Sequence, residues 1–343
     1  MELSLDAIKT YYGKILGASR DLQTGACTCR DDLPSAHRAI LDEIDPEILD
    51  RFYGCGSPIP PALEGCHVLD LGCGSGRDVY LLSRLVGPQG SVTGVDMTTE
   101  QIAIARSHQH RQAERFGFAA SNVTFHHGYF EDLRALGIAD RSFDLVVSNC
   151  AINLSPAKDL VFGEIFRVLK PGGELCFSDV FADRRLPAAL AQDPVLLGEC
   201  LAGALYVEDF RRILGAAGCG DHRVISRCPT PIENPDIEAL LGNARFHTMT
   251  IRAFRLPDLE DRCEDYGQSA VYLGTIPGQP HSFALDDHHL FETGRPKLVC
   301  GNTAAMLSET RYARFFTVTG DRARHFGTFD CAPPLPATGG ACC

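Results

Sequence analysis

The sequence lacks any apolar run long enough to cross a bilayer, and its first residues lack the charged-then-apolar pattern of an export signal. We therefore expect a cytoplasmic protein that does not enter membranes. Positive charge is also scarce, because 32 lysines and arginines stand against 44 aspartates and glutamates, for a formal net charge of −12. This balance argues against general binding to nucleic acids or membrane surfaces. The 343 residues suffice for two or three domains, and no internal repeat divides them.

No cysteine pair has the Cys-x-x-Cys spacing, so the common zinc-binding patterns are absent. Cysteine itself is abundant, with 15 residues, and a reducing compartment would keep most of them as thiols. A buried cysteine commonly acts as a small apolar residue. We give that interpretation to the cysteines in or beside strand-like and helix-like stretches, namely Cys66, Cys73, Cys176, Cys219 and Cys228.

A glycine-rich turn is the most informative feature that the chain does contain. Gly72, Gly74 and Gly76 follow an apolar stretch and precede a helix-like segment. Glycines there let the backbone turn sharply and approach a ligand closely. Asp96 ends the next apolar stretch, at the spacing from which an acidic side chain reaches ribose hydroxyls. The dinucleotide fingerprint would need its third glycine where Arg77 stands, and this departure favours S-adenosylmethionine over a nicotinamide cofactor.

The remaining cofactor contacts are expected at the ends of later strands. Phe130 and Glu131 follow the third predicted strand, where they can meet the adenine. The alternatives are a solvated turn residue for Asp96 and a charge at the start of a helix for Glu131. The predicted cofactor-binding residues at these strand ends are Asp70, Gly72, Gly74, Gly76, Asp96, Met97, Phe130, Glu131 and Asn149.

Strand-like and helix-like patterns alternate between residues 66 and 179. The predicted strands are Val68–Leu71, Ser91–Val95, Val123–His126, Phe143–Ser148 and Glu174–Ser178, and the predicted helices are Arg77–Val86, Glu100–Phe116 and Leu160–Leu169. Such alternation is typical of a mostly parallel sheet with helices on both faces, which binds ligands outside the carboxyl ends of its strands. We therefore expect an α/β fold with a Rossmann-like sheet of the class I methyltransferase type.

The segments on either side of this sheet complete the predicted organisation. Helices are expected at Leu5–Leu16, Pro34–Leu49, Pro194–Tyr206 and Val207–Ala217. In the C-terminal part, strands are expected at Met249–Arg255, Ser269–Ile276, Phe283–Leu285 and Phe315–Thr319, with a helix near Asn302–Arg311. The predicted units are a helical and loop extension (1–60) that carries thiols, the cofactor-binding domain (61–228), a smaller C-terminal α+β domain (235–330) and a disordered tail (331–343) that contains Cys342 and Cys343.

The fourth predicted strand leads directly to Asn149 and Cys150. Its carboxyl end is where a methyl acceptor must stand, so Cys150 is either a nucleophile or the ligand of one. Cys200 lies among small residues that allow another element to approach closely, and by itself it reads as a buried helix cysteine.

Taken together, several segments closely resemble the arsenite S-adenosylmethionine methyltransferases. They are Tyr11-Tyr12-Gly13, Leu22-Gln23-Thr24, Tyr53-Gly54-Cys55-Gly56, Leu69-Asp70-Leu71-Gly72, Val92–Met97, Ser148–Leu154 and Gly198–Tyr206. The resemblance covers residues 11–206 and continues more loosely beyond them. It implies four functional cysteines, Cys27, Cys55, Cys150 and Cys200. It also implies that Tyr53 contacts the cofactor and that the segment around Cys200 binds arsenic.

In the family that the chain resembles, the last two of these cysteines hold the arsenic that is methylated. The first two help to bind incoming arsenite and take part in thiol–disulfide exchange, although Cys29 is an extra thiol beside Cys27. The resemblance therefore implies an arsenic site of Cys150, Cys200 and Cys55. It also implies a thiol reductant (glutathione or thioredoxin) as co-substrate, and arsenite or methylarsenite as substrates in the form of thiol adducts. We expect the enzyme to act in arsenic detoxification as a monomer.

Elementary chemistry agrees with this resemblance. Trivalent arsenic is a soft centre that selects thiolates, and it keeps a lone pair that can attack a sulfonium methyl group in line. Correct positioning alone can supply roughly 7–11 kcal/mol of the barrier. Two other functions stay open. One is a methyltransferase for a small organic acceptor, which would not need the thiols, and the other is a thiol-rich arsenic-binding protein, which would not need the glycine turn.

Two further groups of polar residues invite interpretation as metal ligands. They are the pair His126-His127 and the run Asp286-Asp287-His288-His289. Neighbouring residues in a strand point to opposite faces, so we interpret both groups as solvated or loop residues. We also expect the charge of Arg77 to be solvated.

Overall fold

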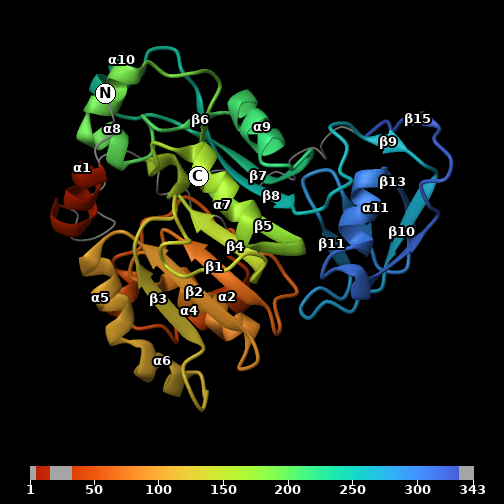
Figure 1. Cartoon of the computed structure of the whole chain (residues 1–343), viewed down its shortest axis with the longest axis horizontal. Coiled ribbons are helices and arrows are strands. Elements are labelled where there is room, and N and C mark those ends of the chain that lie inside the picture. The colour runs from red at the N-terminus through yellow and green to blue at the C-terminus, as the bar shows by residue number, and fades with distance from the viewer. Residues whose placement is uncertain (1–4, 16–32, 332–343) are drawn as a thin grey trace.

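The computed structural model describes residues 5–15 and 33–331 of the chain (Figure 1). Five apolar segments form the parallel part of its central sheet, in the order β3-β2-β1-β4-β5. These strands are β1 (His67–Leu71), β2 (Ser91–Asp96), β3 (Val123–His127), β4 (Phe143–Asn149) and β5 (Leu169–Ala182). The predicted α/β fold is confirmed. Since the strands are parallel, the residues after β1, β2 and β4 meet at one edge of the sheet.

Two antiparallel strands extend this sheet beyond β5. β8 (Phe246–Phe254) pairs with β5, and β7 (His222–Thr230) pairs with β8. We expected the strand at 249–255 in the smaller C-terminal unit, and that placement is wrong. β8 is almost entirely buried because it lies inside the large sheet, and its nine-residue pairing with β5 joins segments about seventy residues apart that no local pattern connects.

Helices cover both faces of the sheet, as predicted. On one face, α7 (Lys158–Val168) and α9 (Val207–Ala216) pack in a core that includes Phe162, Phe177 and Phe210. On the other face, α4 (Arg77–Val86) and α5 (Thr99–Ser107) pack in a core around Leu81 and Ile102. The helix predicted over 100–116 is divided at His108 into α5 and α6 (Gln109–Arg115).

The segments before and after the sheet differ from prediction in two places. The helix predicted over 34–49 is two helices, α2 (Ser35–Leu41) and α3 (Pro46–Leu49), because Pro46 starts a new helix after the Asp45 cap. The helix predicted over 194–206 is also wrong. α8 (Pro194–Gly198) ends early, and the chain turns at Cys200 into β6 (Leu205–Tyr206), which pairs with β5.

At the N-terminus, α1 (Leu5–Thr10) continues into a π-helical turn, η1 (Tyr11–Ile15). The predicted Cys27 lies outside the described residues, as do Cys29, Cys342 and Cys343. Short 3₁₀ turns occur at η3 (Ile152–Leu154), η4 (Ala188–Gln192) and η5 (Ala313–Phe315). α10 (Pro235–Leu241) stands between β7 and β8 in the chain.

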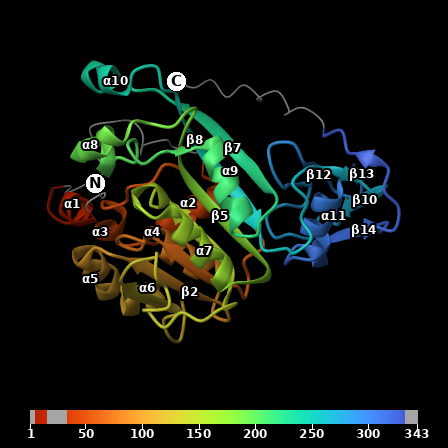
Figure 2. The same ribbon diagram turned by 45° about the horizontal axis from the view of Figure 1, so that its top comes forward.

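The C-terminal unit lies beside the ends of β7 and β8 (Figures 1 and 2). Its three-stranded antiparallel sheet consists of β13 (Pro296–Val299), β10 (Gln268–Tyr272) and β14 (Phe316–Thr319). The helix α11 (Gly301–Ser308) packs on this sheet. Two strand pairs complete it, β11 (Ser282–Ala284) with β12 (Leu290–Glu292) and β9 (Glu264–Asp265) with β15 (Gly327–Thr328). The predicted α+β character is confirmed.

Asp286 and His289, interpreted as solvated or loop residues, do lie in the loop between β11 and β12, but they are buried. The Asp286 carboxylate accepts hydrogen bonds from the backbone N–H of His288 and from the ring of His289 at 2.8 Å. Arg223 of β7 lies 3.4 Å from the same carboxylate. The polar run therefore joins the C-terminal unit to the large sheet.

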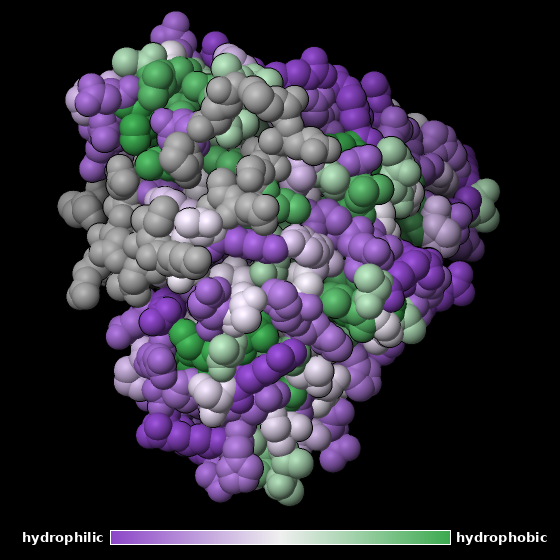
Figure 3. Space-filling model, turned by 60° about the vertical axis from the view of Figure 1, so that its left-hand side comes forward, coloured by the Kyte–Doolittle hydropathy of each residue, from purple (hydrophilic) through white to green (hydrophobic). Residues whose placement is uncertain are grey.

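Hydrophilic side chains cover most of the face shown in Figure 3, and apolar ones gather there in separate patches. Within the described ranges, no helix combines the length and the apolar character needed to cross a membrane.

Candidate functional site at the carboxyl edge of the sheet

The turn after β1 requires glycine at two positions. Gly72 and Gly74 have left-handed φ values of 76° and 52°. A Cβ atom on Gly72 would also lie only 2.2 Å from that of Ala151, whereas the space beside Gly74 is open. The turn is fastened to β2, because the N–H of Gly74 donates to the Asp96 carboxylate at 2.9 Å. Gly76, the N-cap of α4, also has a left-handed φ of 94°, and a Cβ atom there would lie 3.0 Å from the Phe125 ring; it lines neither of the two cavities described below.

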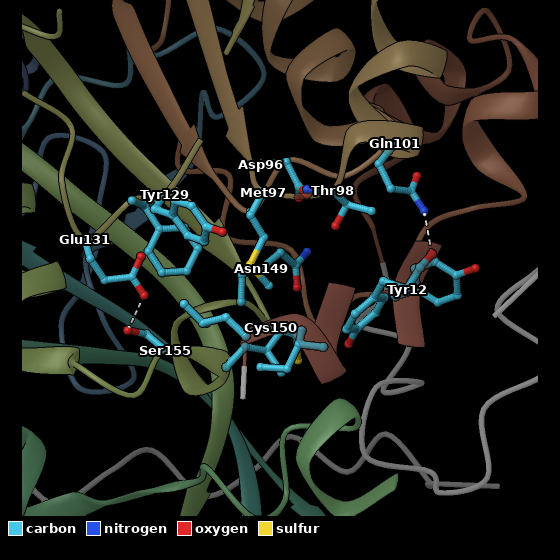
Figure 4. Close-up of a pocket in the computed structure, with 17 residues that line it drawn as sticks. Tyr12, Asp96, Met97, Thr98, Gln101, Tyr129, Glu131, Asn149, Cys150 and Ser155 are labelled. Carbon is cyan, nitrogen blue, oxygen red and sulfur yellow. Dashed lines mark hydrogen bonds between the residues drawn. The ribbon is translucent and has the colours of Figure 1, made fainter. Parts of the chain in front are cut away.

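Two adjoining cavities open beside this turn, and both are bordered by Tyr53, Gly72 and Asn149. Figure 4 shows the first, which extends along the ends of β2 and β4 towards α1. The second follows the glycine turn to Asp70 and Asp78. Nine of the ten predicted cofactor residues line one or both cavities: Tyr53, Asp70, Gly72, Gly74, Asp96, Met97, Phe130, Glu131 and Asn149.

Several carboxylates line these two cavities. Burial raises the pKa of Asp70 well above its usual range, and the nearby charges of Asp78 and Asp96 raise it further. Burial also raises the pKa of Asp96, although the backbone N–H groups of Thr98 and Gly74 donate to it. Because like charges repel at such sites, a ligand that brings positive charge would be favoured over an anionic one.

The far wall of the first cavity is aromatic and polar. Tyr129 and Phe130 line it after β3, and the Glu131 carboxylate accepts a 2.6 Å hydrogen bond from Ser155 (Figure 4). This wall can receive a flat ring at one end and hydrogen-bonding groups beside it.

Three of the predicted cysteines meet below the same cavity. Cys55 and Cys150 form a disulfide with their Cα atoms 5.8 Å apart, and the Cys200 thiol donates to the Cys150 carbonyl oxygen at 3.1 Å. All three are buried, and Cys150 lines the cavity (Figure 4). We expected Cys55 and Cys150 to be arsenic-binding thiols, whereas their sulfurs are joined to each other. These thiols therefore become available only after the disulfide is reduced.

Cys150 and Cys200 also have unusual backbones. Their φ values are 54° and 64°, and they are two of the four non-glycine residues in the described part of the chain with positive φ. Such conformations cost of order 1–3 kcal/mol and persist where the surroundings impose them. Here the N–H of Cys150 donates to Ser178 at 2.8 Å, and that of Cys200 donates to Leu197 at 3.2 Å. The fold thus holds both residues in conformations that local propensity disfavours.

Asn149 connects the loop that carries Cys55 to α4, the helix that follows the glycine turn. Its side-chain oxygen accepts the N–H of Cys55 at 3.0 Å, and its amide nitrogen donates to Gly56 at 2.8 Å and to Asp78 at 3.0 Å. One side chain therefore fixes the position of Cys55 relative to the cofactor cavity.

Comparison with known proteins gives a consistent result along most of the chain. Residues 62–218 match the family described as methyltransferase domain, and residues 266–334 match the arsenite methyltransferase C-terminal domain. An arsenite methyltransferase of Aquipseudomonas alcaligenes is 53% identical over 332 residues, which are 96% of this chain and 95% of that protein. The chain belongs to the arsenite methyltransferase family.

Other members of the family agree. The mouse arsenite methyltransferase is 44% identical over 315 residues, covering 91% of this chain and 82% of that protein. The crystal structure of CrArsM, an arsenic(III) S-adenosylmethionine methyltransferase from Chlamydomonas reinhardtii, has a TM-score of 0.84 at 52% identity, and the match covers 87% of this chain and all of that chain. The chain is therefore a transferase of the S-adenosylmethionine-dependent class, with the class I methyltransferase fold.

Asp179 lies beside Cys55 and Cys150, and we did not predict a role for it from the sequence. One of its carboxylate oxygens and the sulfurs of Cys55 and Cys150 fall within 4.8 Å of one another. Complete burial raises the pKa of Asp179 to about 7, although the N–H groups of Val180 and Asn153 donate to it. Near neutral pH a share of the molecules therefore carries a neutral carboxyl beside the disulfide.

The sequence analysis missed several residues that line the first cavity, namely Tyr12, Thr98, Gln101, Tyr129 and Ser155. Thr98 and Gln101 follow Asp96 at the end of β2. The expectation that ligands bind at the carboxyl ends of the strands could therefore have identified them. Gln101 donates to the Tyr12 carbonyl at 3.5 Å and so connects the N-terminal segment to this edge (Figure 4). The Arg77 side chain, expected to be solvated, is only 11% exposed, with its guanidinium 3.7 Å from the centre of the Phe52 ring and 3.1 Å from Asp78.

Proposed function

We propose that this enzyme methylates trivalent arsenic, taken up as arsenite or methylarsenite in thiol complexes, with S-adenosylmethionine as the methyl donor. Cys150 and Cys200 hold the arsenic, and Cys55 and Cys27 take part in its uptake and in thiol–disulfide exchange. The convergence of Cys55 and Cys200 on Cys150, which itself lines the cofactor cavity, is the observation that carries this proposal.

The residues of the two cavities fit the proposed methyl donor. When bound, S-adenosylmethionine supplies a methyl carbon on a positively charged sulfur, and this carbon accepts the arsenic lone pair. The open turn at Gly74 leaves room for the amino-acid part of the cofactor, and the carboxylates of Asp70 and Asp96 favour its positive charges. Asp96 is suited to receive ribose hydroxyls, and Phe130 and Glu131 border the space suited to adenine.

The cysteines position the arsenic, which is the atom that accepts the methyl group. Arsenic bound to thiolates needs no general base, because it has no proton to lose at the attacking atom. Thiolate ligands suit this soft centre better than the carboxylates nearby. The backbone restraints on Cys150 and Cys200 limit their motion, which favours the positional contribution to catalysis.

Turnover requires that the Cys55–Cys150 disulfide be opened first. Two equivalents of a thiol such as glutathione, or one reduced thioredoxin, donate two electrons and two protons, so that both cysteines become thiols and the reductant becomes a disulfide. We infer that the enzyme works as a monomer in the cytoplasm, where such reductants are abundant, and serves in arsenic detoxification.

Product analysis tests the proposal. The purified chain is incubated with arsenite, S-adenosylmethionine and a thiol reductant, and the arsenic species are separated and quantified. We expect methylated arsenic, together with S-adenosylhomocysteine, only when all three are present. Omission of the reductant is expected to stop the reaction. Recovery of inorganic arsenic alone from the complete mixture, with the protein still folded, would refute the proposal.

Asn149→Ala tests how far the link between the cysteine loop and the cofactor cavity matters. The substitution removes three hydrogen bonds that position Cys55 and Asp78. A small displacement of reacting groups lowers rates steeply, so we expect kcat/KM for arsenite methylation to fall by roughly 10–100-fold. Steady-state kinetics, corrected for the folded fraction measured by circular dichroism, provide the value.

Asn122→Ala is the matched control for this substitution. Asn122 also donates from its amide to backbone carbonyls, of Ser83 and Gly87, but it lies at the opposite end of the strands. Its loss is expected to lower stability while leaving kcat/KM of the folded protein within twofold or so of the parent. Equal losses of activity in the two variants would mean that Asn149 acts only through stability.

A further inference from the structure

The N-terminal segment, which consists of α1 and η1, forms one wall of the cofactor cavity. Leu5, Ile8 and Tyr12 line that cavity (Figure 4). The Lys9 ammonium lies 4.7 Å from the centre of the Tyr129 ring, which lines the same cavity. The proposed reaction uses no side chain of this segment, so its remaining contacts call for an explanation.

The same segment also contacts the turn that carries Cys200. The Tyr11 hydroxyl donates to the Glu199 carboxyl at 3.0 Å, and the Tyr12 hydroxyl donates to the Gly198 carbonyl oxygen at 2.6 Å. A Cβ atom on Gly198 would lie only 2.5 Å from the Tyr11 ring, so the ring packs directly on the backbone of the turn. Glu199 and Cys200 are completely buried, and Tyr11 is buried as well. Two neighbouring tyrosines therefore bind the two residues that precede Cys200.

The turn is also held by η3, which follows Cys150. A Cβ atom on Gly203 would lie 2.1 Å from the Asn153 carbonyl oxygen, so the turn and η3 are in close contact. The Cys200 thiol donates to the Cys150 carbonyl oxygen at 3.1 Å, and the φ value of Cys200 is 64°. A backbone in this conformation keeps its geometry only where its surroundings impose it. η3 supplies some of the contacts that do so, and Tyr11 supplies others.

We propose that Tyr11 and Tyr12 are positioning residues for the arsenic site. They hold the turn at Gly198–Cys200, so that the Cys200 thiol stays beside Cys150. The inference rests on the proposed function, because it takes these two cysteines as the ligands of arsenic. Thiols that are already held in place bind a ligand more tightly than thiols that must be ordered on binding. Among the residues that the structure describes, Tyr12 lines the first cavity and Tyr11 does not, so the Tyr11 hydroxyl should matter for arsenic and not for the methyl donor.

Arsenite binding to the reduced full-length chain tests this role without any methyl transfer. Equilibrium dialysis in the presence of S-adenosylhomocysteine gives the arsenic bound per chain, and subtraction of the arsenic that Cys200→Ser binds leaves the part that depends on Cys200. Tyr11→Phe removes a hydroxyl but keeps the ring that packs on Gly198. Because a buried hydrogen bond is lost, we expect the dissociation constant of the Cys200-dependent arsenite to rise roughly tenfold. Tyr12→Phe, which loses the hydrogen bond to Gly198, should raise this constant by a similar factor.

Steady-state kinetics separate positioning from a general loss of structure. In Tyr11→Phe the KM for arsenite is expected to rise roughly tenfold, while the KM for S-adenosylmethionine stays within about twofold of the parental value. Tyr272→Phe is the matched control, because Tyr272 is also buried and its hydroxyl donates to the Gln279 carbonyl oxygen at 2.7 Å, in the C-terminal unit. This variant should keep the parental KM for both substrates.

The outcomes distinguish failure of this proposal from failure of the proposed function. If Cys200→Ser binds as much arsenite as the parent, no arsenic depends on Cys200, and both are refuted. If arsenic does depend on Cys200, unchanged affinity in Tyr11→Phe and Tyr12→Phe would overturn the positioning role alone. Equal rises of the two KM values in Tyr11→Phe, or a rise of the same size in Tyr272→Phe, would overturn it as well.

Discussion

Replacement of Cys150 by serine is expected to lower kcat/KM for arsenite methylation at least about a thousandfold. Serine preserves the shape of the side chain but replaces a soft thiolate with a hard hydroxyl, which trivalent arsenic does not select. Positioning of the acceptor can contribute roughly 7–11 kcal/mol, and a loss of only about 4 kcal/mol corresponds to a thousandfold in rate. The rate of S-adenosylhomocysteine release, with speciation of arsenic, gives the value.

The same substitution should leave the cofactor cavity intact. Cys150 contributes one part of the cavity wall, whereas Gly72, Gly74 and Asp96 form the turn and its partner on β2. The affinity for S-adenosylmethionine, measured by calorimetry, is therefore expected to change less than about threefold, well under 1 kcal/mol. Cys66→Ser, at the start of β1, is the control and should retain parental activity. Near-parental methylation by Cys150→Ser would show that its sulfur does not hold the reacting arsenic.

A large loss of stability is expected when Glu174 of β5 is changed to glutamine. Its fully buried carboxylate accepts from Arg252 of β8 at 2.9 Å and from the Tyr312 hydroxyl at 3.2 Å, and it lies 2.5 Å from the Arg311 guanidinium. The amide cannot neutralise the two arginines, which remain buried. Breaking a buried ion pair in this way costs about 3–5 kcal/mol, so the urea midpoint should fall accordingly.

A surface ion pair provides the matched control for Glu174→Gln. Glu292 pairs with Arg295 at 2.6 Å, but their side chains are 54% and 75% exposed. The substitution Glu292→Gln removes the same charge in water and should change the free energy of unfolding by less than about 1 kcal/mol. Because Arg311 and Tyr312 belong to the C-terminal unit, the Glu174 variant should also release that unit to proteolysis. Equal midpoints for the two variants would contradict the role assigned to Glu174.

The parallel strands and the cofactor residues could be predicted because both follow local rules. Each strand from β1 to β5 is an apolar run bounded by turn residues, and the carboxyl ends of parallel strands meet at one edge. Asp96, Phe130 and Asn149 were found by that rule. Thr98 and Gln101 satisfy it as well but lie one turn further on, and Tyr12 comes from the N-terminal segment with no local signal of its own.

Apart from the helices divided at Pro46 and His108, the incorrect expectations concern long-range structure. β8 reads as a buried strand, but its partner β5 lies far away in sequence, so its sheet could not be inferred. The segment around Cys200 has helix-forming residues, yet tertiary contacts hold that cysteine at φ 64° and end the helix at Gly198. The low exposure of the Arg77 side chain and the burial of the loop residue Asp286 depend likewise on partners from other elements.

The positions of the thiols are also set by tertiary structure. The family resemblance implied Cys55, Cys150 and Cys200, but not that the first two would be joined to each other.

Location of arsenic by anomalous scattering tests the central claim most directly. Crystals of the reduced chain are soaked with arsenite and S-adenosylhomocysteine, and the arsenic positions are read from the anomalous difference map. We predict a strong arsenic peak bonded to the sulfurs of Cys150 and Cys200, facing the cavity that holds the nucleoside. Arsenic bound at other thiols, with none at Cys150 and Cys200 in an enzyme that methylates it, would contradict the account.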